Sequence, residues 1–339
     1  MKKVTIQNSG HSFDVRPSQT VLEAAIEADI HIPYGCRNGA CGSCKAKLVS
    51  GKVMHDDYQN SAMTDTELAA GNTLLCCARP LEDIVVECRE VGGLTGIKPR
   101  ILPARVVKKE QLAHDVIALH LQLPASERLH FLAGQYLEFI LKDGKRRAFS
   151  LANAPHDAEF LQLHIRVIPG GTFSAYVANE MQEKAILRLE APFGNFFLRE
   201  DSQKPAIFVA GGTGFAPVKG IIEHMLHNNI QREIILYRGA RQLQDLYMHD
   251  LCEKWAEFTP HLTYIPVISE PENDNWQGRT GLVHEAVLAD HKDLSGFQAY
   301  VCGAPGMCEV AHNTFVAQGL SPDEFFSDAF TFAAVPKPT

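Results

Sequence analysis

Hydrophobic and polar residues alternate in short runs at the start of the chain. The stretches "KVTIQ" and "HSFDVR" place apolar side chains at every second position and are separated by the turn residues "NSG", so they predict a β-hairpin. The next stretch, "TVLEAAIEAD", changes to the spacing of a helix, and Thr20 followed by Glu23 forms a capping-box pattern at its start. We therefore expect a helix that packs on the sheet of the hairpin.

The rest of the chain shows two further patterns. A run of strand-like segments, among them "DVIALHLQL", "QYLEFIL" and "FLQLHIRVI", predicts an antiparallel β-barrel. After it, apolar strands alternate with amphipathic helices: "AIFVAGG" precedes "APVKGIIEHMLHN", and "EIILYRGA" precedes "DLYMHDLCEKWAEF". This alternation predicts a parallel sheet with helices on both faces, which commonly binds a nucleotide.

Polar stretches that contain glycine or proline separate these regions. "VGGLTGIKPR" at residues 91–100 and "REDSQKP" at residues 199–205 interrupt the regular patterns. We predict three domains, which span residues 1–93, 99–200 and 204–335.

Composition excludes several classes of protein. The formal net charge is −8 and the chain has no cluster of lysine and arginine, which argues against binding to nucleic acid. The N-terminus lacks an apolar run of secretory length, and no stretch reaches the ~18 apolar residues of a membrane span. We expect no membrane association and a cytoplasmic location, where a reducing environment disfavours disulfides between the nine cysteines.

The cysteines themselves indicate a metal centre. "YGCRNGACGSC" at residues 34–44 has the spacing C-x4-C-x2-C, and a fourth cysteine follows in "TLLCCARP". This is the ligand spacing of a plant-type [2Fe–2S] cluster, with Cys36, Cys41, Cys44 and Cys76 as the ligands. The glycines of the loop allow backbone amides to turn toward anionic sulfur; they are Gly35, Gly39 and Gly42.

Two alternatives to this metal assignment stay open. A structural zinc site usually presents two C-x2-C pairs, and only one pair here has that spacing. Cys77 directly follows Cys76, so the spacing also allows Cys77 to be the fourth ligand.

The cysteine motif, together with the rest of the chain, resembles the ferredoxin-fused, flavin-dependent NADH reductases of the ferredoxin reductase superfamily. Within them, the chain is most similar to the group of CDP-6-deoxy-3,4-glucoseen reductases and phenol hydroxylase reductases. The resemblance implies a multidomain α+β and α/β protein: an N-terminal β-grasp ferredoxin, an antiparallel flavin-binding β-barrel and a C-terminal parallel α/β nucleotide-binding domain. It also implies that hydride passes from NADH to FAD, and single electrons then pass through the [2Fe–2S] cluster to a protein acceptor, an oxygenase or deoxysugar dehydrase component. A diaphorase that reduces small acceptors is the alternative.

The resemblance assigns the flavin-binding residues to two motifs. In "RRAFSLANAP", Arg147 is expected to meet the flavin pyrophosphate, Phe149 to pack on the flavin, and Ser150 to lie near flavin N5. In "PGGTFS", a glycine turn and a helix start are expected to bind the pyrophosphate. The residues of this second motif are Gly171, Thr172 and Ser174, with Arg166 as a further candidate.

The nicotinamide nucleotide is expected at the turn of "VAGGTGFAPV". The residues implied there are Gly212, Thr213 and Gly214. Arg241 in "YRGAR" is expected to contact the adenosine ribose, with Arg238 also beside it. Because no serine accompanies these arginines to help bind a 2′-phosphate, we expect NADH to be preferred over NADPH.

The last motifs lie near the C-terminus. In "YVCGAPGM", Cys302 and Gly303 end a strand, and the resemblance places the cysteine beside the hydride path. In "FFSDAF", Phe330 occupies the position of an aromatic residue close to the isoalloxazine, although this chain has Asp-Ala where the family leads us to expect Glu-Lys.

Overall fold

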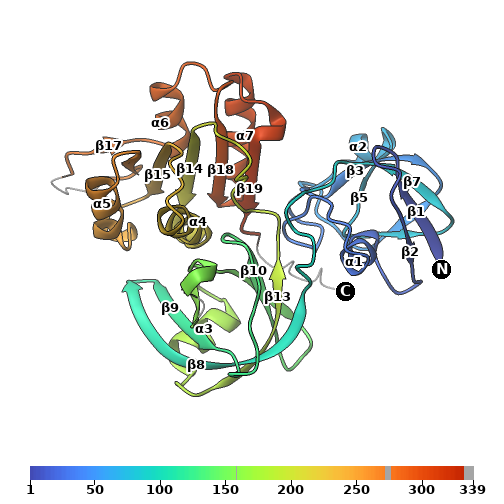
Figure 1. The fold of residues 1–339 in the computed structure, drawn as a ribbon, viewed down its shortest axis with the longest axis horizontal. Coiled ribbons are helices and arrows are strands. Elements are labelled where there is room, and N and C mark those ends of the chain that lie inside the picture. Colours follow the sequence, from blue (N-terminus) through green and yellow to red (C-terminus); the bar gives the residue numbers. More distant parts are fainter. Residues whose placement is uncertain (158, 272–275, 332–339) are drawn as a thin grey trace. The chain divides into compact units, whose positions relative to one another are not determined.

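The computed structural model describes residues 1–157, 159–271 and 276–331 and divides into two compact units. The first unit contains Met1–Pro99, and the second contains Arg100–Phe330 (Figure 1). Among the helices of the described residues, none is long and apolar enough to cross a membrane.

The first unit is a mixed sheet with the helix α1 packed on it. Its elements are β1 (Lys2–Ile6), β2 (Ser12–Val15), α1 (Val21–Glu27), β3 (Lys45–Ser50), β4 (Val53–His55), α2 (Asp65–Ala69), β5 (Asn72–Leu74), β6 (Ala78–Pro80) and β7 (Ile84–Glu87). The main sheet has the order β2-β1-β7-β3-β5, and β4 pairs separately with β6. The predicted hairpin is confirmed by the antiparallel pair β1 and β2, and the predicted capping box is present at Thr20 and Glu23.

The first part of the second unit is an antiparallel barrel, as predicted. Its elements are β8 (Arg100–Ala113), β9 (Val116–Gln122), β10 (Tyr136–Ile140), β11 (Arg146–Ser150), η1 (Pro155–Asp157), β12 (Leu161–Arg166), α3 (Thr172–Asn179) and β13 (Ile186–Phe193). The strand order is β11-β10-β13-β8-β9-β12, and every pairing is antiparallel. The bridge between Leu151 and Leu163 joins the two ends of this order, which closes the sheet around an apolar core.

The second part is a parallel sheet between two layers of helices. Its elements are β14 (Ala206–Gly211), η2 (Gly212–Gly214), α4 (Phe215–His227), β15 (Ile234–Ala240), η3 (Leu243–Asp245), α5 (His249–Phe258), β16 (Leu262–Ile268), β17 (Arg279–Thr280), α6 (Val283–Asp290), β18 (Gln298–Gly303), α7 (Pro305–Ala317), η4 (Pro322–Glu324) and β19 (Phe325–Ala329). The strands run parallel in the order β17-β16-β15-β14-β18-β19.

Two apolar clusters show how the helices cover this sheet. Residues of α4 and α5 pack on one face, and residues of α6 and α7 pack on the other (Figure 1). Both faces of the strands are therefore buried, which explains their nearly continuous apolar sequences. The carboxyl ends of β14 and β18 lie side by side, and this is the edge where a parallel sheet binds its ligand.

Candidate functional site

The cysteine loop between α1 and β3 directs backbone amides at sulfur. The amides of Ala40 and Cys41 each lie 3.3 Å from Cys36 Sγ, and the Cys36 amide lies 3.4 Å from Cys41 Sγ. Gly39 and Gly42 have φ angles of +71° and +75°, which glycine adopts without strain. A Cβ on Gly42 would lie 2.9 Å from the Ala62 carbonyl, so a side chain there would force the loop to move.

The four predicted ligands form two pairs. Cys41 accepts a hydrogen bond from Cys36, which lowers the pKa of Cys41 to about 6. Cys76 accepts hydrogen bonds from Cys44 and Cys77. Together they lower the pKa of Cys76 to about 4, and the bond from Cys44 has the larger effect. The sulfurs of each pair lie within hydrogen-bonding distance of each other, and each would bind metal as a thiolate.

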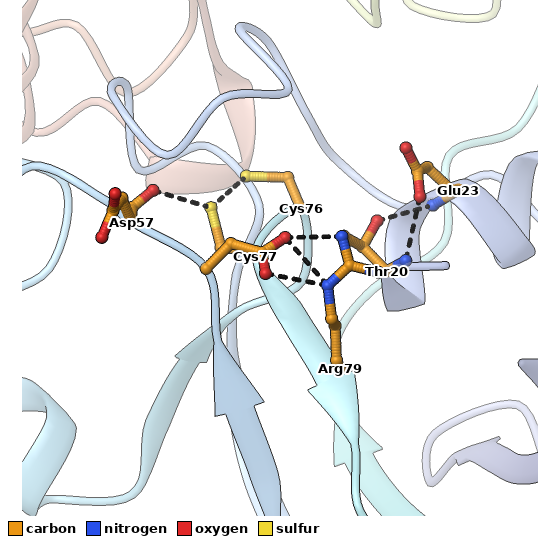
Figure 2. Close-up of polar contacts among 7 residues, drawn as sticks. Thr20, Glu23, Asp57, Cys76, Cys77 and Arg79 are labelled. Atoms are coloured by element: carbon orange, nitrogen blue, oxygen red, sulfur yellow. Dashed lines mark hydrogen bonds and ion pairs between the residues drawn. The ribbon is translucent and has the colours of Figure 1, made fainter. Parts of the chain in front are cut away.

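Cys76 and Cys77 lie in a turn that other elements hold in place. Figure 2 shows both thiols side by side, with the two Sγ atoms 3.6 Å apart and Cys77 Sγ 3.8 Å from the Asp57 carbonyl. The turn begins at Leu75, whose carbonyl accepts a hydrogen bond from the amide of Leu22 in the first turn of α1. Because the two thiols are adjacent in the sequence and their sulfurs lie together, spacing alone could not separate the two candidate ligands.

The strand that follows this turn is fixed by an ion pair. Arg79 donates two hydrogen bonds to the Asp56 carboxylate, from Nη2 to Oδ2 at 2.7 Å and from Nε to Oδ1 at 2.8 Å. This pair ties β6 to the end of β4, and the Asp56 amide also donates to the Cys77 carbonyl. The backbone on both sides of the fourth ligand is therefore held by hydrogen bonds.

The donor set fits a [2Fe–2S] cluster better than a zinc ion. In such a cluster each iron takes two cysteine ligands, which matches the pairs Cys36 with Cys41 and Cys44 with Cys76. Cys44 and Cys76 are buried and Cys36 and Cys41 are half-buried, so one pair lies closer to solvent.

The predicted flavin strand is β11, where Arg147 and Phe149 lie on one side. Both side chains are half-buried, whereas the residues between and before them, Arg146 and Ala148, are exposed. The Phe149 ring packs 5.5 Å from the Phe173 ring of α3, centroid to centroid. The structure thus brings the two predicted flavin motifs together, because Phe173 lies inside "PGGTFS".

The start of α3 has the form of an anion-binding turn. Its N-cap is Gly171, which supplies no side-chain hydrogen bond to the helix amides. Ser174 Oγ instead donates to the Gly171 carbonyl and accepts from the Ile168 amide, at 3.2 Å each, so it braces the turn. Thr172 is the first residue of the helix. Uncapped amides at a helix start suit a phosphate.

The nucleotide turn η2 is packed directly against the end of β18. A Cβ on Gly214 would lie 2.2 Å from the Cys302 carbonyl oxygen, and one on Gly303 would lie 3.1 Å from the Gly211 carbonyl. Gly212 has a φ of +54°, and its Cβ would lie 3.3 Å from Arg166 Nη1, which places Arg166 beside this turn. Thr213 is the middle residue of η2.

A serine, a cysteine and an aspartate come together where the barrel meets the parallel sheet. Ser150 Oγ donates to Asp328 Oδ2 at 3.3 Å, and Asp328 pairs with Cys302 across β19 and β18. Cys302 is completely buried, and burial first and the Asp328 carboxylate second raise the pKa of its thiol well above the ordinary value. Cys302 is therefore a neutral thiol that fills space. Asp328 is the aspartate of the Asp-Ala pair in "FFSDAF", and its contact with Ser150 was not predicted from the sequence.

The two arginines expected at the ribose site differ. Arg238 is 2% exposed, its guanidinium carbon lies 3.7 Å from the centre of the Phe215 ring, and it donates to the Tyr247 carbonyl at 2.8 Å. The expectation that Arg238 flanks a ribose is therefore wrong, because its charged group is enclosed by packing. Arg241, by contrast, is exposed.

The structure places Phe330 directly after β19, where its backbone amide donates to the Gly303 carbonyl at 2.8 Å.

Three family models match consecutive parts of the chain. The 2Fe-2S iron-sulfur cluster binding domain matches residues 4–81, the oxidoreductase FAD-binding domain matches residues 103–198, and the oxidoreductase NAD-binding domain matches residues 208–313. Their order is the order of the three regions described above.

Curated relatives cover nearly the whole chain. The CDP-6-deoxy-L-threo-D-glycero-4-hexulose-3-dehydrase reductase of Yersinia pestis is 40% identical over 96% of this chain and 98% of its own length. The terephthalate 1,2-dioxygenase reductase component 1 of Comamonas sp is 33% identical over 97% of both. Among solved structures, the Amycolatopsis cytochrome P450 reductase has a TM-score of 0.84 and 32% identity, over 98% of this chain and 100% of that one.

Proposed function

Because this chain belongs to the ferredoxin-fused, NAD- and flavin-dependent reductases, it is an oxidoreductase that passes electrons from NADH through FAD to a [2Fe–2S] cluster, and we propose that an oxygenase component or a deoxysugar dehydrase receives them. FAD is needed because it accepts a hydride and releases single electrons, which a one-electron cluster requires. The half-buried pair Cys36 and Cys41 carries the proposal of a protein acceptor, because it lies nearest to solvent within the cysteine loop.

The proposed roles of the residues follow from their places in the fold. Residues 1–93 hold the cluster, residues 99–200 hold FAD, and residues 204–335 hold the nucleotide. The phosphates of FAD lie at the start of α3, with Arg147 and Arg166 as the cations beside them. Ser150 and Cys302 flank the hydride path, where the small thiol lets two rings approach closely.

The nucleotide preference is proposed to be for NADH. Since Arg238 is enclosed by packing, Arg241 is left as the arginine of "YRGAR" that can approach the ribose. No serine stands beside Arg241 in "YRGAR" to help bind a 2′-phosphate. The ratio of kcat/KM for NADH to that for NADPH tests this, and a ratio below one would assign Arg241 to the phosphate.

The acceptor is tested by reconstitution. The purified holoprotein is mixed with NADH and either a deoxysugar dehydrase or a terephthalate-type oxygenase, and product formation is measured. The matched control is Cys44→Ser, which removes a ligand of the more buried pair and is expected to keep ferricyanide reduction but to abolish product formation. If product forms equally well with Cys44→Ser, the flavin rather than the cluster is the outlet. If the wild-type protein reduces ferricyanide but forms no product with either component, the protein is a diaphorase.

A cytoplasmic location is proposed on chemical grounds. All nine cysteines lie among the described residues and are free thiols. Cluster ligands have to stay reduced until iron binds, and the cytosol maintains that state.

A further inference from the structure

The face of β12 that points away from the barrel core carries two polar residues, of which Gln162 is half-buried and His164 is buried. Leu161, Leu163 and Ile165 point into the barrel core, so Gln162 and His164 point to the opposite side of the strand. That side is covered by the parallel sheet's elements, because Lys219 of α4 donates to Gln162 Oε1 at 3.1 Å. His164 is 4% exposed although it is polar.

His164 makes a hydrogen bond to a tyrosine of the nucleotide-binding part. His164 Nδ1 lies 3.0 Å from the Tyr247 hydroxyl, and the two rings meet edge to face with centroids 5.3 Å apart. Tyr247 is 3% exposed, and His164 Nε2 is buried without a hydrogen-bond partner. A buried polar group that keeps a single partner makes that partner costly to lose.

Tyr247 is packed against the start of the nucleotide helix. Its ring centroid lies 5.8 Å from that of Phe215, the first residue of α4, directly after the glycine turn η2. The Arg238 guanidinium carbon lies 3.7 Å from the centre of the Phe215 ring, and Arg238 donates to the Tyr247 carbonyl. A continuous buried path therefore joins β12 of the barrel to the turn that approaches the nucleotide.

We infer that His164 and Tyr247 are positioning residues for hydride transfer: their buried hydrogen bond fixes the nucleotide turn relative to the flavin-binding strands. Hydride transfer requires close and aligned rings, and a misplacement of about 1 Å can cost about 100-fold in rate. The inference rests on the proposed hydride path from NADH to FAD.

The test is the rate at which NADH reduces the bound FAD in the holoprotein, measured by stopped-flow absorbance. Tyr247→Phe removes only the hydroxyl and is expected to slow reduction about tenfold, with unchanged FAD content and unchanged cluster absorption. The matched control is Tyr264→Phe, because the Tyr264 hydroxyl makes a similar bond, 2.8 Å from His249 Nδ1, within the nucleotide-binding part alone. Tyr264→Phe is expected to stay within twofold of the wild-type rate.

A second pair of variants separates positioning from general damage. His164→Asn keeps a polar atom near the Nδ1 position and should retain most of the rate, whereas His164→Leu should be as slow as Tyr247→Phe. The double variant His164→Leu/Tyr247→Phe should be no slower than either single variant, since both remove one interaction.

Two results would overturn the inference. They are a Tyr247→Phe rate within twofold of wild type, and an equal loss in Tyr264→Phe. A wild-type holoprotein whose FAD is not reduced by NADH would instead refute the proposed function, and the inference with it.

Discussion

At the scale of single residues, the choice between Cys76 and Cys77 has a clear experimental consequence. Cys76 is the sulfur that Cys44 and Cys77 both face, and its pKa is the one lowered to about 4. Cys77 lies beyond it, near the Asp57 carbonyl. We predict that Cys76→Ser loses most of the cluster iron and its visible absorption bands, whereas Cys77→Ser keeps both.

Iron analysis and the visible spectrum of the two purified variants decide this point. Each substitution replaces one buried thiol with a hydroxyl, and both lie in the same turn, so each serves as the other's control. A normal spectrum in Cys76→Ser would make Cys77 the ligand.

Asp328 is the second residue with a defined consequence. Its carboxylate accepts from Ser150, and Asp328 pairs with Cys302 across β19 and β18, so it orients the serine hydroxyl that we propose lies at the hydride path. We predict that Asp328→Ala slows FAD reduction by NADH about 100-fold, the scale of a misplacement of about 1 Å at the reacting groups. Ser327→Ala, the preceding residue of β19, is the control and should have little effect; an equal loss there would mean that β19 is merely unstable.

Single-residue roles could be predicted where a motif fixes spacing, and not where packing decides. The assignment of four cysteine ligands follows from C-x4-C-x2-C and the later cysteine and stays a prediction, and the structure gathers these cysteines in pairs. Arg238 lies in β15 and Arg241 directly follows this strand, and nothing in the local sequence tells which of the two side chains is enclosed. Phe215, on the preceding helix, and Tyr247, in the loop after the strand, enclose it.

At the scale of elements, the nucleotide turn depends on the absence of a side chain. A Cβ on Gly214 would lie 2.2 Å from the Cys302 carbonyl oxygen, which is backbone and cannot move aside alone. We predict that Gly214→Ala raises KM for NADH at least about tenfold, because the turn must shift by a fraction of an ångström or more. The control is Gly306→Ala in α7, where nothing lies within 4 Å; a KM that rises equally there would contradict this reading.

The elements themselves were largely predictable from periodicity, and the exceptions come from long-range contacts. The stretch "DLYMHDLCEKWAEF" predicts one helix, but α5 begins at His249. Met248 has a left-handed φ of +56°, and Tyr247 is turned away to reach His164 on β12. A hydrogen bond to a strand more than 80 positions earlier leaves no mark in the local pattern of hydrophobic residues.

At the scale of the whole molecule, burial of His164 makes stability depend on pH. Burial first, and the charges of Lys219 and Arg238 next, hold the pKa of His164 well below its ordinary value. Below about pH 6.5 the unfolded chain binds a proton at this residue that the folded chain does not bind, so stability is full above that pH and falls toward acid. The loss approaches about 1.4 kcal/mol per pH unit for one proton.

The measurement is the midpoint temperature of FAD release at pH 7.5 and pH 5.5. The wild-type midpoint temperature should be lower at pH 5.5 than at pH 7.5. His164→Asn should show a smaller decrease, because it removes one titrating group. The exposed His130 provides the control His130→Gln, whose fall should equal that of the wild type. Equal falls in all three proteins would mean that His164 does not contribute.

The division of the chain at Pro99 and Arg100 leads to the last prediction. A truncated chain that begins at Lys98 keeps the barrel and the parallel sheet, whose apolar cores are formed within that unit. It should bind FAD, stay yellow and reduce ferricyanide with NADH at close to the full-length rate, because this small oxidant takes electrons directly from flavin. Reduction of cytochrome c should fall by at least about tenfold, since the one-electron carrier to a large protein is gone.

Arg147→Ala in the full-length chain is the converse variant: it should weaken FAD retention and lower both activities while the cluster spectrum stays intact. If the truncated chain does not fold, the boundary is misplaced, and if it reduces cytochrome c at the full rate, the flavin rather than the cluster is the outlet.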